Sequence, residues 1–267
     1  MAHTLVDSHA HLDMEEFDED RDQVVQRAFQ EGIRSILCPA DLTNPKSIQK
    51  TFDLTEKYES FIAAAGVHPH QAKYFTPSHT QRIEELAGDK KIKAVGEIGL
   101  DFHYDFSPRQ KQEEVFRHQL SAAQKLGLPV VVHSRNSGKE VAQAIEEEHF
   151  SKGGILHCFT EDWTLAKRMM DHNFLISFSG ILTFPKAHPL REIAKKIPLE
   201  KLLVETDSPY LVPFPLKGKK KRNEPAHVIE TAKVLAGIKK ISLDKLARAT
   251  SQNFESLFMF EIKNPRC

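Results

Sequence analysis

The sequence predicts a TIM-type (β/α)8 barrel, an α/β fold in which strand and helix alternate eight times. Three observations favour it. Apolar runs of strand length occur eight times, amphipathic segments typical of helices separate them, and 267 residues are a usual length for one such barrel. We therefore expect a single barrel domain over residues 1–267, with a doubly wound open sheet as the competing architecture.

The expected strands are short apolar runs that alternate with longer charged segments. In chain order they span residues 3–7, 33–40, 61–66, 92–97, 128–133, 154–158, 174–179 and 202–207. A helix is expected over residues 107–127, because Ser107-Pro108 is a typical helix start and Gly127 a typical helix end. A second amphipathic segment, residues 19–32, follows the first strand in the same way.

The composition is that of a soluble globular protein, with 40% hydrophobic and 28% charged residues and a formal net charge of zero. Any nucleic-acid partner must therefore be bound by a local patch. The three cysteines, Cys38, Cys158 and Cys267, form no CxxC pair, which favours a reducing compartment. No apolar run approaches the ~20 residues that span a membrane, and the N-terminus lacks a signal-peptide core. We expect an intracellular protein, cytoplasmic or nuclear and not secreted, with no membrane association and no obligate protein partner.

Residue types that bind metal ions follow five of the expected strands. The first strand leads into two histidines, and the fourth, fifth, sixth and eighth each end in a histidine or a carboxylate. These residues are His9, His11, Glu97, His133, His157 and Asp207. In a barrel, the C-terminal ends of all strands meet at one rim, where active sites lie. The coincidence of five strands predicts a metal site at that rim.

The ligand set contains histidine and carboxylate but no cysteine, which suits Zn, Mn, Ni, Co or Fe, and Mg where carboxylates dominate. Six ligands exceed what one catalytic zinc takes from a protein, so two divalent cations about 3.5–4 Å apart fit better. We expect Glu97 to bridge them, because the fourth strand lies between the two ligand groups. One cation would be bound by His9, His11, Glu97 and Asp207, and the other by Glu97, His133 and His157.

Longer motifs accompany these residues. They are DSHAHLD (7–13), GVHPH (66–70), GEIGLDFH (96–103), LPVVVHSR (128–135), HCF (157–159), ISFSGILTF (176–184), VETDSPYL (204–211) and RNEP (222–225). With them, the chain resembles the TatD family of metal-dependent deoxyribonucleases over nearly its whole length. The resemblance implies a barrel of the metallo-dependent hydrolase type, the same six ligands, and a phosphodiesterase that often acts as a 3′-to-5′ exonuclease on DNA. We expect single-stranded DNA or 3′ ends as the partner.

One motif departs from the family pattern. Family members commonly read HCFSG after the sixth strand, whereas this chain reads HCFTED. Glu161 and Asp162 leave the ligands unchanged but add negative charge near the expected mouth of the barrel, which bears on the choice of substrate.

We assign catalytic roles to Glu97 and Asp207. A bridging carboxylate holds both cations, and a carboxylate beside an activated water can take its proton. Glu205 shares a strand face with Asp207. It either orients a metal ligand from behind or forms a buried ion pair within the barrel.

Five residues are candidates for contacts with substrate phosphates. They are His68 and His70 in GVHPH, Arg135, which has the same strand parity as His133, and Arg222 and Asn223 in RNEP. Arg135 can offer a bidentate fork to phosphate. Alternatively, Arg135 forms a structural ion pair with a carboxylate, and GVHPH can equally be a rigid turn.

Two further features allow more than one interpretation. The basic run KGKKKR (217–222) fits a contact with the DNA backbone, a nuclear-localisation signal or a solvated loop. The aromatic residues Phe102, Tyr104 and Phe106 can stack on bases at the mouth or form a hydrophobic lid.

Two other functions compete with a deoxyribonuclease. The same scaffold can hydrolyse an ester, amide or lactone in a small molecule or an aminoacyl-tRNA, and a non-catalytic protein can bind metal or nucleic acid. Glu97 stands where many two-metal amidohydrolases carry a carbamylated lysine, which favours the nuclease. The intact set of six ligands argues against a role in binding alone.

Overall fold

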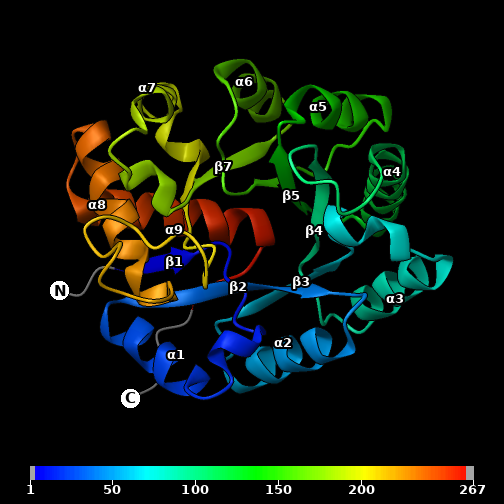
Figure 1. Ribbon diagram of the computed structural model, residues 1–267, viewed down its shortest axis with the longest axis horizontal. Coiled ribbons are helices and arrows are strands. Elements are labelled where there is room, and N and C mark those ends of the chain that lie inside the picture. Colours follow the sequence, from blue (N-terminus) through cyan, green and yellow to red (C-terminus); the bar gives the residue numbers. More distant parts are fainter. Residues whose placement is uncertain (1–3, 263–267) are drawn as a thin grey trace.

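The computed structural model describes residues 4–262 and shows parallel strands rolled into a barrel (Figure 1). The strands are β1 (Leu5–Asp7), β2 (Ile33–Asp41), β3 (Ile62–Gly66), β4 (Ala94–Asp101), β5 (Val130–Arg135), β6 (Gly154–Leu156), β7 (Phe174–Phe178) and β8 (Leu202–Val204). They are neighbours in chain order from β1 to β8. An open doubly wound sheet reverses its strand order partway, so this order confirms the predicted barrel. His3, expected in the first strand, lies outside the described residues.

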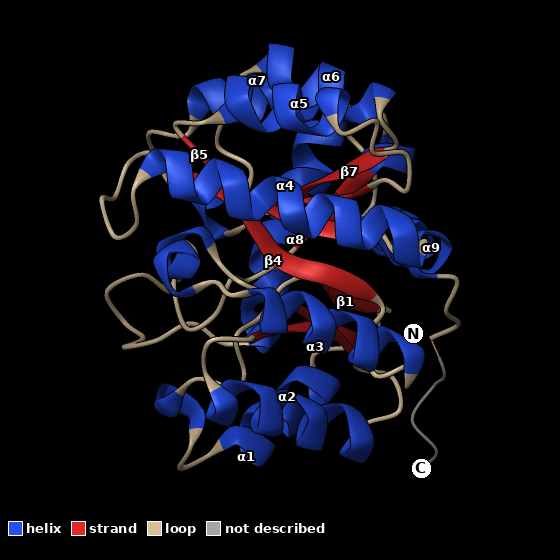
Figure 2. Ribbon diagram, turned by 90° about the vertical axis from the view of Figure 1, so that its right-hand side faces the viewer, coloured by secondary structure: helices blue, strands red, loops and turns tan. Residues whose placement is uncertain are grey.

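Helices surround the sheet and follow the strands in turn (Figures 1 and 2). They are α1 (Arg21–Gln30), α2 (Pro45–Lys57), α3 (Pro77–Gly88), α4 (Arg109–Leu126), α5 (Gly138–Glu147), α6 (Trp163–Asp171), α7 (His188–Lys196), α8 (Val228–Lys239) and α9 (Leu243–Phe258). Short 3-10 helices are η1 (Glu15–Phe17), η2 (Pro69–Tyr74), η3 (Gly180–Thr183), η4 (Leu199–Lys201) and η5 (Pro225–His227). The helix expected over residues 107–127 is α4. Gly127 ends it with a φ of 72°, a left-handed conformation that glycine adopts without steric cost.

The barrel closes between β1 and β8 just beyond the ends of these strands. The N–H of Ser8 donates to the carbonyl oxygen of Val204 at 3.1 Å, and the N–H of Asp207 donates to that of His9 at 2.9 Å. The closing contacts therefore join the two segments that carry His9 and Asp207.

The interior of the barrel is apolar and is closed at its N-terminal end by α9. Phe254 and Phe258 of α9 pack against residues that the strands direct inward, among them Val6 and Leu203. The side chain of Asn253 donates to the carbonyl oxygen of Leu202 at the start of β8, at 2.9 Å. The cavity that contains the candidate site residues lies at the other, C-terminal end of the barrel.

Strand β4 is longer than the sequence predicts, since it continues to Asp101 instead of ending at Glu97. Its register with β5 shifts between Val95 and Ile98, beside Glu97. A Cβ atom on Gly99 would lie 2.0 Å from the carbonyl oxygen of His133, so only glycine allows β4 to pass β5 this closely. By contrast, β6 and β8 end before His157 and Asp207, which therefore lie on the loops that follow.

No helix within residues 4–262 combines the length and the apolar character needed to cross a membrane. Cys38 is buried and Cys158 is partly exposed, and both are free thiols. Cys267 lies outside the described residues.

Candidate metal centre

A cavity of about 820 Å³ opens at the C-terminal ends of the strands. Five of the six ligands and three of the five phosphate contacts predicted from the sequence line it. They are His11, His68, His70, Glu97, His133, Arg135, His157 and Asp207. The volume lies within the range of about 300–1,000 Å³ that is usual for small-ligand sites.

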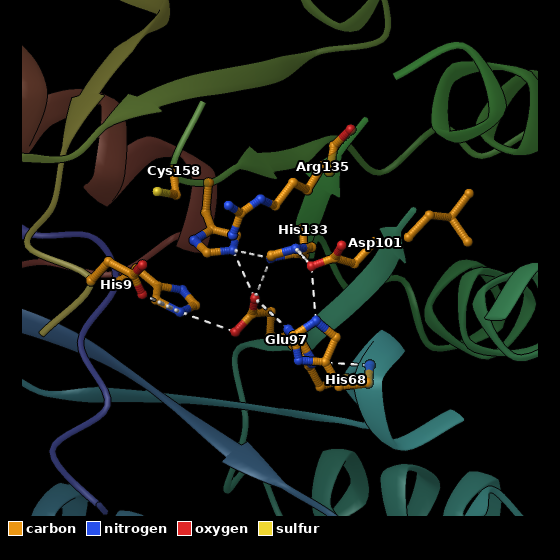
Figure 3. A network of polar contacts seen from close by, with 12 residues as sticks. His9, His68, Glu97, Asp101, His133, Arg135 and Cys158 are labelled. Atoms are coloured by element: carbon orange, nitrogen blue, oxygen red, sulfur yellow. Dashed lines mark hydrogen bonds and ion pairs between the residues drawn. The ribbon is translucent and has the colours of Figure 1, made fainter. Parts of the chain in front are cut away.

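Glu97 lies at the centre of the cluster, between His9 on one side and His68 and His133 on the other (Figure 3). Its Oε2 atom is 3.2 Å from Nε2 of His9 and 3.5 Å from Nε2 of His11. Oδ1 of Asp207 lies 3.5 Å from the same nitrogen of His11. These four side chains form the first of the two groups that the sequence predicts.

The other carboxylate oxygen of Glu97 faces the second group. Oε1 lies 2.7 Å from Nε2 of His157 and 3.0 Å from Nδ1 of His133. Nε2 of His68 is also within 3.2 Å of Oε1. The structure therefore places His68 among the candidate ligand atoms, although the sequence suggested it only as a phosphate contact.

The electrostatics of the cluster keep both acidic groups ionised. Burial raises the pKa of Glu97, but the surrounding histidines outweigh it and hold the pKa well below the ordinary value. Burial likewise opposes ionisation of Asp207, and its hydrogen bond with His11 brings its pKa below the usual range. Burial lowers the pKa of His68 to about 4. In His11, burial is outweighed by the contact with Asp207, which raises the pKa to about 9.

The side chains fit divalent cations. Three triads bring one ligand atom from each member within 4.8 Å of the other two: His9, Glu97 and His157; His9, His11 and Asp207; and His68, Glu97 and His133. The Nε2 atoms of His9 and His11, which are both imidazole nitrogens, lie 3.1 Å apart. Nitrogen lone pairs and carboxylate oxygens that converge in this way form the donor set of zinc, manganese, cobalt or nickel sites.

Glu205 contacts His157 of the second group on the side of the ring that faces away from Glu97. It is fully buried, and its Oε1 accepts a hydrogen bond from the N–H of Cys158 at 2.7 Å. The same oxygen lies 3.3 Å from Nδ1 of His157, the ring nitrogen that does not face Glu97. No arginine or lysine pairs with Glu205 among the ion pairs of the described residues, so the structure favours the orienting role over the buried ion pair.

Asp101 is a site residue that the sequence analysis missed. Its Oδ2 lies 3.2 Å from Nε2 of His133 and 2.8 Å from Nε2 of His70. Despite burial, these contacts hold the pKa of Asp101 below its ordinary value. The signal was the motif GEIGLD, in which Asp101 lies four residues after Glu97 and, with the strand continued, on the same strand face.

Asp7 is a second buried carboxyl group beside the ligands. It accepts hydrogen bonds from Oγ1 of Thr206 at 2.5 Å and from the N–H of Thr206 at 2.9 Å. Burial raises its pKa to about 8 despite these bonds. The contact ties the end of β1 to the segment that carries Asp207.

Arg135 lines the cavity, and in Figure 3 its side chain is directed toward the centre of the barrel rather than toward the outer helices. Its guanidinium lies 4.8 Å from the centre of the Tyr104 ring. None of the ion pairs of the described residues involves Arg135, so its charge is available to an anion in the cavity.

The structure does not bring Arg222 and Asn223 to the cavity. The guanidinium of Arg222 donates to Asp20 at 2.7 Å and lies over the ring of Phe17. Asn223 is fully buried and donates to the carbonyl oxygen of Thr206 at 3.0 Å. Both side chains hold the loop after β8 in place, Arg222 against the segment before α1, and neither lines the cavity where the substrate contact was expected.

Glu161 and Asp162, the acidic residues of the segment HCFTED, also have structural partners. Oε1 of Glu161 accepts hydrogen bonds from Oγ of Ser134 at 3.1 Å and from the N–H of Ser137 at 3.3 Å, on either side of Arg135. Asp162 caps α6 by accepting from the N–H of Leu165 at 2.9 Å. Glu161 thus fixes the loop that carries Arg135.

The comparisons with known proteins agree with this geometry. The model of a family described as TatD related DNase matches residues 6–259. The chain is 38% identical over 255 residues to the uncharacterized metal-dependent hydrolase YabD of Bacillus subtilis, covering 95% of this chain and 98% of YabD. It is 35% identical over 259 residues to a protein of Shigella flexneri named 3′-5′ ssDNA/RNA exonuclease TatD, covering 95% and 98%. The crystal structure of YjjV, a TatD homologue from Escherichia coli, superposes with a TM-score of 0.90 at 28% identity, covering 98% of this chain and 100% of YjjV.

Proposed function

This chain belongs to the TatD-related DNase family, which includes metal-dependent hydrolases, and from this premise we propose that it cleaves DNA phosphodiesters as a 3′-to-5′ exonuclease with two divalent cations. One observation carries the proposal: the two oxygens of Glu97 face two different sets of nitrogens. A carboxylate so placed can bridge two cations.

The two ligand groups correspond to two cation positions. His9, His11, Glu97 and Asp207 would hold one cation. The other would be held by Glu97, His133, His157 and His68, the last added because of its distance from Oε1. When bound, such cations supply Lewis-acid activation of water and neutralise charge on a phosphate.

The protein's own groups contribute proton transfer and orientation. Asp207 is ionised and partly exposed to the cavity, so it can accept a proton from the attacking water. Glu205 holds the ring of His157, and Asp101 holds the rings of His133 and His70. These contacts fix the directions of the ligand nitrogens before a substrate binds.

Arg135 and His70 are the residues that we assign to the substrate phosphate. Both line the cavity, and Arg135 brings a permanent positive charge to a centre rich in carboxylates. The relative from Shigella flexneri is named for single-stranded DNA and RNA. We assign single-stranded DNA, approached from its 3′ end, as the substrate of this chain.

The test is digestion of single-stranded DNA labelled at either its 5′ or its 3′ end, with Mg²⁺, Mn²⁺, Zn²⁺, Co²⁺ or Ni²⁺ added separately. We expect a ladder that shortens from the 3′ end and disappears in EDTA. The variant Glu97→Gln, which keeps the shape of the side chain, is the matched control and should be inactive. Hydrolysis of small carboxylic esters or lactones without any cleavage of DNA would refute the proposal.

A further inference from the structure

Two exposed aromatic rings lie beside the metal centre, on the loop between β4 and α4. Tyr104 is 39% exposed and Phe106 is 54% exposed, and their rings stack with centres 5.4 Å apart and an angle of 26° between the planes. We call this pair the aromatic shelf. Tyr104 lines the same cavity as the ligands, and the guanidinium of Arg135 lies 4.8 Å from the centre of its ring.

The loop that carries the aromatic shelf is held at both ends by one buried side chain. Gln112 of α4 accepts from the N–H of Asp101 at 2.8 Å and donates to the carbonyl oxygens of Asp101 and Ser107. Oδ1 of Asp101 also accepts from the N–H of Tyr104 at 3.0 Å. The loop is therefore clamped from residue 101 to residue 107. This argues against a mobile lid and for a preformed surface.

We propose that the aromatic shelf is a nucleobase site, in which Tyr104 stacks on an unpaired base of the nucleotide whose phosphate reaches the metal centre; the inference rests on the proposed hydrolysis of DNA. Aromatic rings stack on every base, so the site tolerates any sequence. Bases inside a duplex already have both faces covered by neighbours. Tyr104 is thus a specificity-determining residue that selects single strands over duplex DNA.

The cation beside the ring matches this ligand. A nucleotide presents a flat base and a negative phosphate a few bonds apart. Tyr104 and Arg135 present an aromatic ring and a positive charge that are close together in the same way, with the guanidinium 4.8 Å from the centre of the ring. His70 lies between the aromatic shelf and the ligand cluster, because its ring centre is 4.8 Å from that of Phe106 and its Nε2 is 2.8 Å from Oδ2 of Asp101. The aromatic shelf is therefore continuous with the groups that we assign to the phosphate.

The experiment compares two single-stranded oligothymidylates, one of them with tetrahydrofuran abasic residues at its two 3′-terminal positions. KM and kcat are measured for wild type, Tyr104→Ala and Tyr104→Phe with the metal that activates best. Tyr74→Ala is the matched control, because Tyr74 is an exposed tyrosine with Lys73 over its ring but lies outside the cavity. A third oligomer carries 2-aminopurine at its 3′ end and reports stacking by fluorescence quenching without any need for hydrolysis.

We expect Tyr104→Ala to raise KM for the normal oligomer by about tenfold and to leave the abasic oligomer unchanged. Tyr104→Phe and Tyr74→Ala should behave as wild type, and quenching should be lost only in Tyr104→Ala. If wild type hydrolyses DNA but Tyr104→Ala affects both oligomers equally, the nucleobase site is refuted and the proposed hydrolysis stands. If wild type hydrolyses neither oligomer yet quenches 2-aminopurine through Tyr104, the hydrolysis is refuted and the nucleobase site stands. Absence of both signals refutes both.

Discussion

Oε1 of Glu205 lies 3.3 Å from Nδ1 of His157, and Oε1 of Glu97 lies 2.7 Å from Nε2 of the same ring. The imidazole is thus held between two carboxylates, one on the cavity side and one fully buried. A carboxylate behind a histidine fixes the orientation of the ring and makes the facing nitrogen a stronger ligand. This relationship gives the first prediction.

Glu205→Gln should weaken metal binding while the barrel still folds. Glutamine keeps the size of the side chain but removes the charge behind His157, and partners of this kind change metal affinity by about 10–100-fold. Calorimetric titration with Zn²⁺ or Mn²⁺ measures the effect. Glu200→Gln, at an exposed position in η4, is the matched control and should bind metal as wild type does. Equal affinities in the two variants would remove Glu205 from this role.

Glu97→Ala should disturb both cation positions, whereas His157→Ala should affect chiefly one. Wild type should bind about two divalent ions per chain, because Glu97 offers one oxygen to each ligand group. Elemental analysis after dialysis gives the number of ions, and circular dichroism checks that each variant is folded. Two tightly held ions in Glu97→Ala would show that the carboxylate does not bridge.

Arg135→Ala should lower turnover, by about 100-fold, as for other preorganised groups that stabilise charge in a transition state. Arg135→Lys should recover part of the loss, since lysine keeps the charge but not the planar fork. The measurement is kcat on single-stranded DNA at saturating concentration. The control is Arg82→Ala, on the exposed face of α3, which should have no effect. A change in KM alone would mean that Arg135 does not act on the reacting phosphate.

The basic run KGKKKR does not line the cavity, but the loop that contains it follows β8 at the end of the barrel where the cavity opens. Changing Lys219, Lys220 and Lys221 together to Ala should weaken DNA binding and leave kcat unchanged. The slope of log K against log salt should shrink by roughly 0.7 for each phosphate of a single strand that these lysines no longer neutralise. Binding titrations at several salt concentrations measure it.

A matched triple variant separates this effect from net charge. Lys195, Lys196 and Lys201 lie where α7 leads into β8, at the N-terminal end of the barrel. Changing them together to Ala removes the same charge from the opposite rim, and the salt slope should remain that of wild type. The same slope in both triple variants would show KGKKKR to be a solvated loop or a targeting signal.

Phe254→Ala should lower the free energy of unfolding by about 3–5 kcal/mol, the usual cost of removing a buried aromatic side chain. Phe254 is fully buried and packs into the apolar interior from α9. Thermal or urea denaturation measures the loss. Metal affinity of the folded variant should be that of wild type, because the ligands lie at the other end of the barrel. A parallel loss of metal affinity would contradict this separation.

Much of the site could be predicted because strand ends are a local feature of the sequence. Apolar runs mark the strands, parallel topology brings their C-terminal ends together, and the residue types at those ends identify the candidate ligands that the structure brings together. Asp101 was missed because the expected strand ends at Glu97, whereas β4 continues through Ile98 and Leu100 to Asp101. The apolar residues that follow Glu97 in GEIGLD are the local sign of this continuation.

Arg222 shows that contacts between distant parts of the chain could not be predicted from a motif. Its motif suggested a contact with substrate, yet its charge is paired with Asp20, which is 202 positions away in the chain. Pairings over such separations depend on how α1 and the loop after β8 are packed, and nothing near Arg222 in the sequence specifies them. His68 was placed at the correct rim, but its distance from Glu97 depends on how β3 and β4 lie side by side.

The packing of α9 against the interior has a consequence for how a polymer is handled. Phe254 and Phe258 fill one of the two ends of the described barrel, so the cavity at the other end does not continue through the barrel. A nucleic-acid strand cannot be threaded through it as through a ring. Under the proposed hydrolysis, the released nucleotide and the shortened strand must leave through the opening by which the strand entered. A mononucleotide product should therefore compete with the incoming strand for this opening.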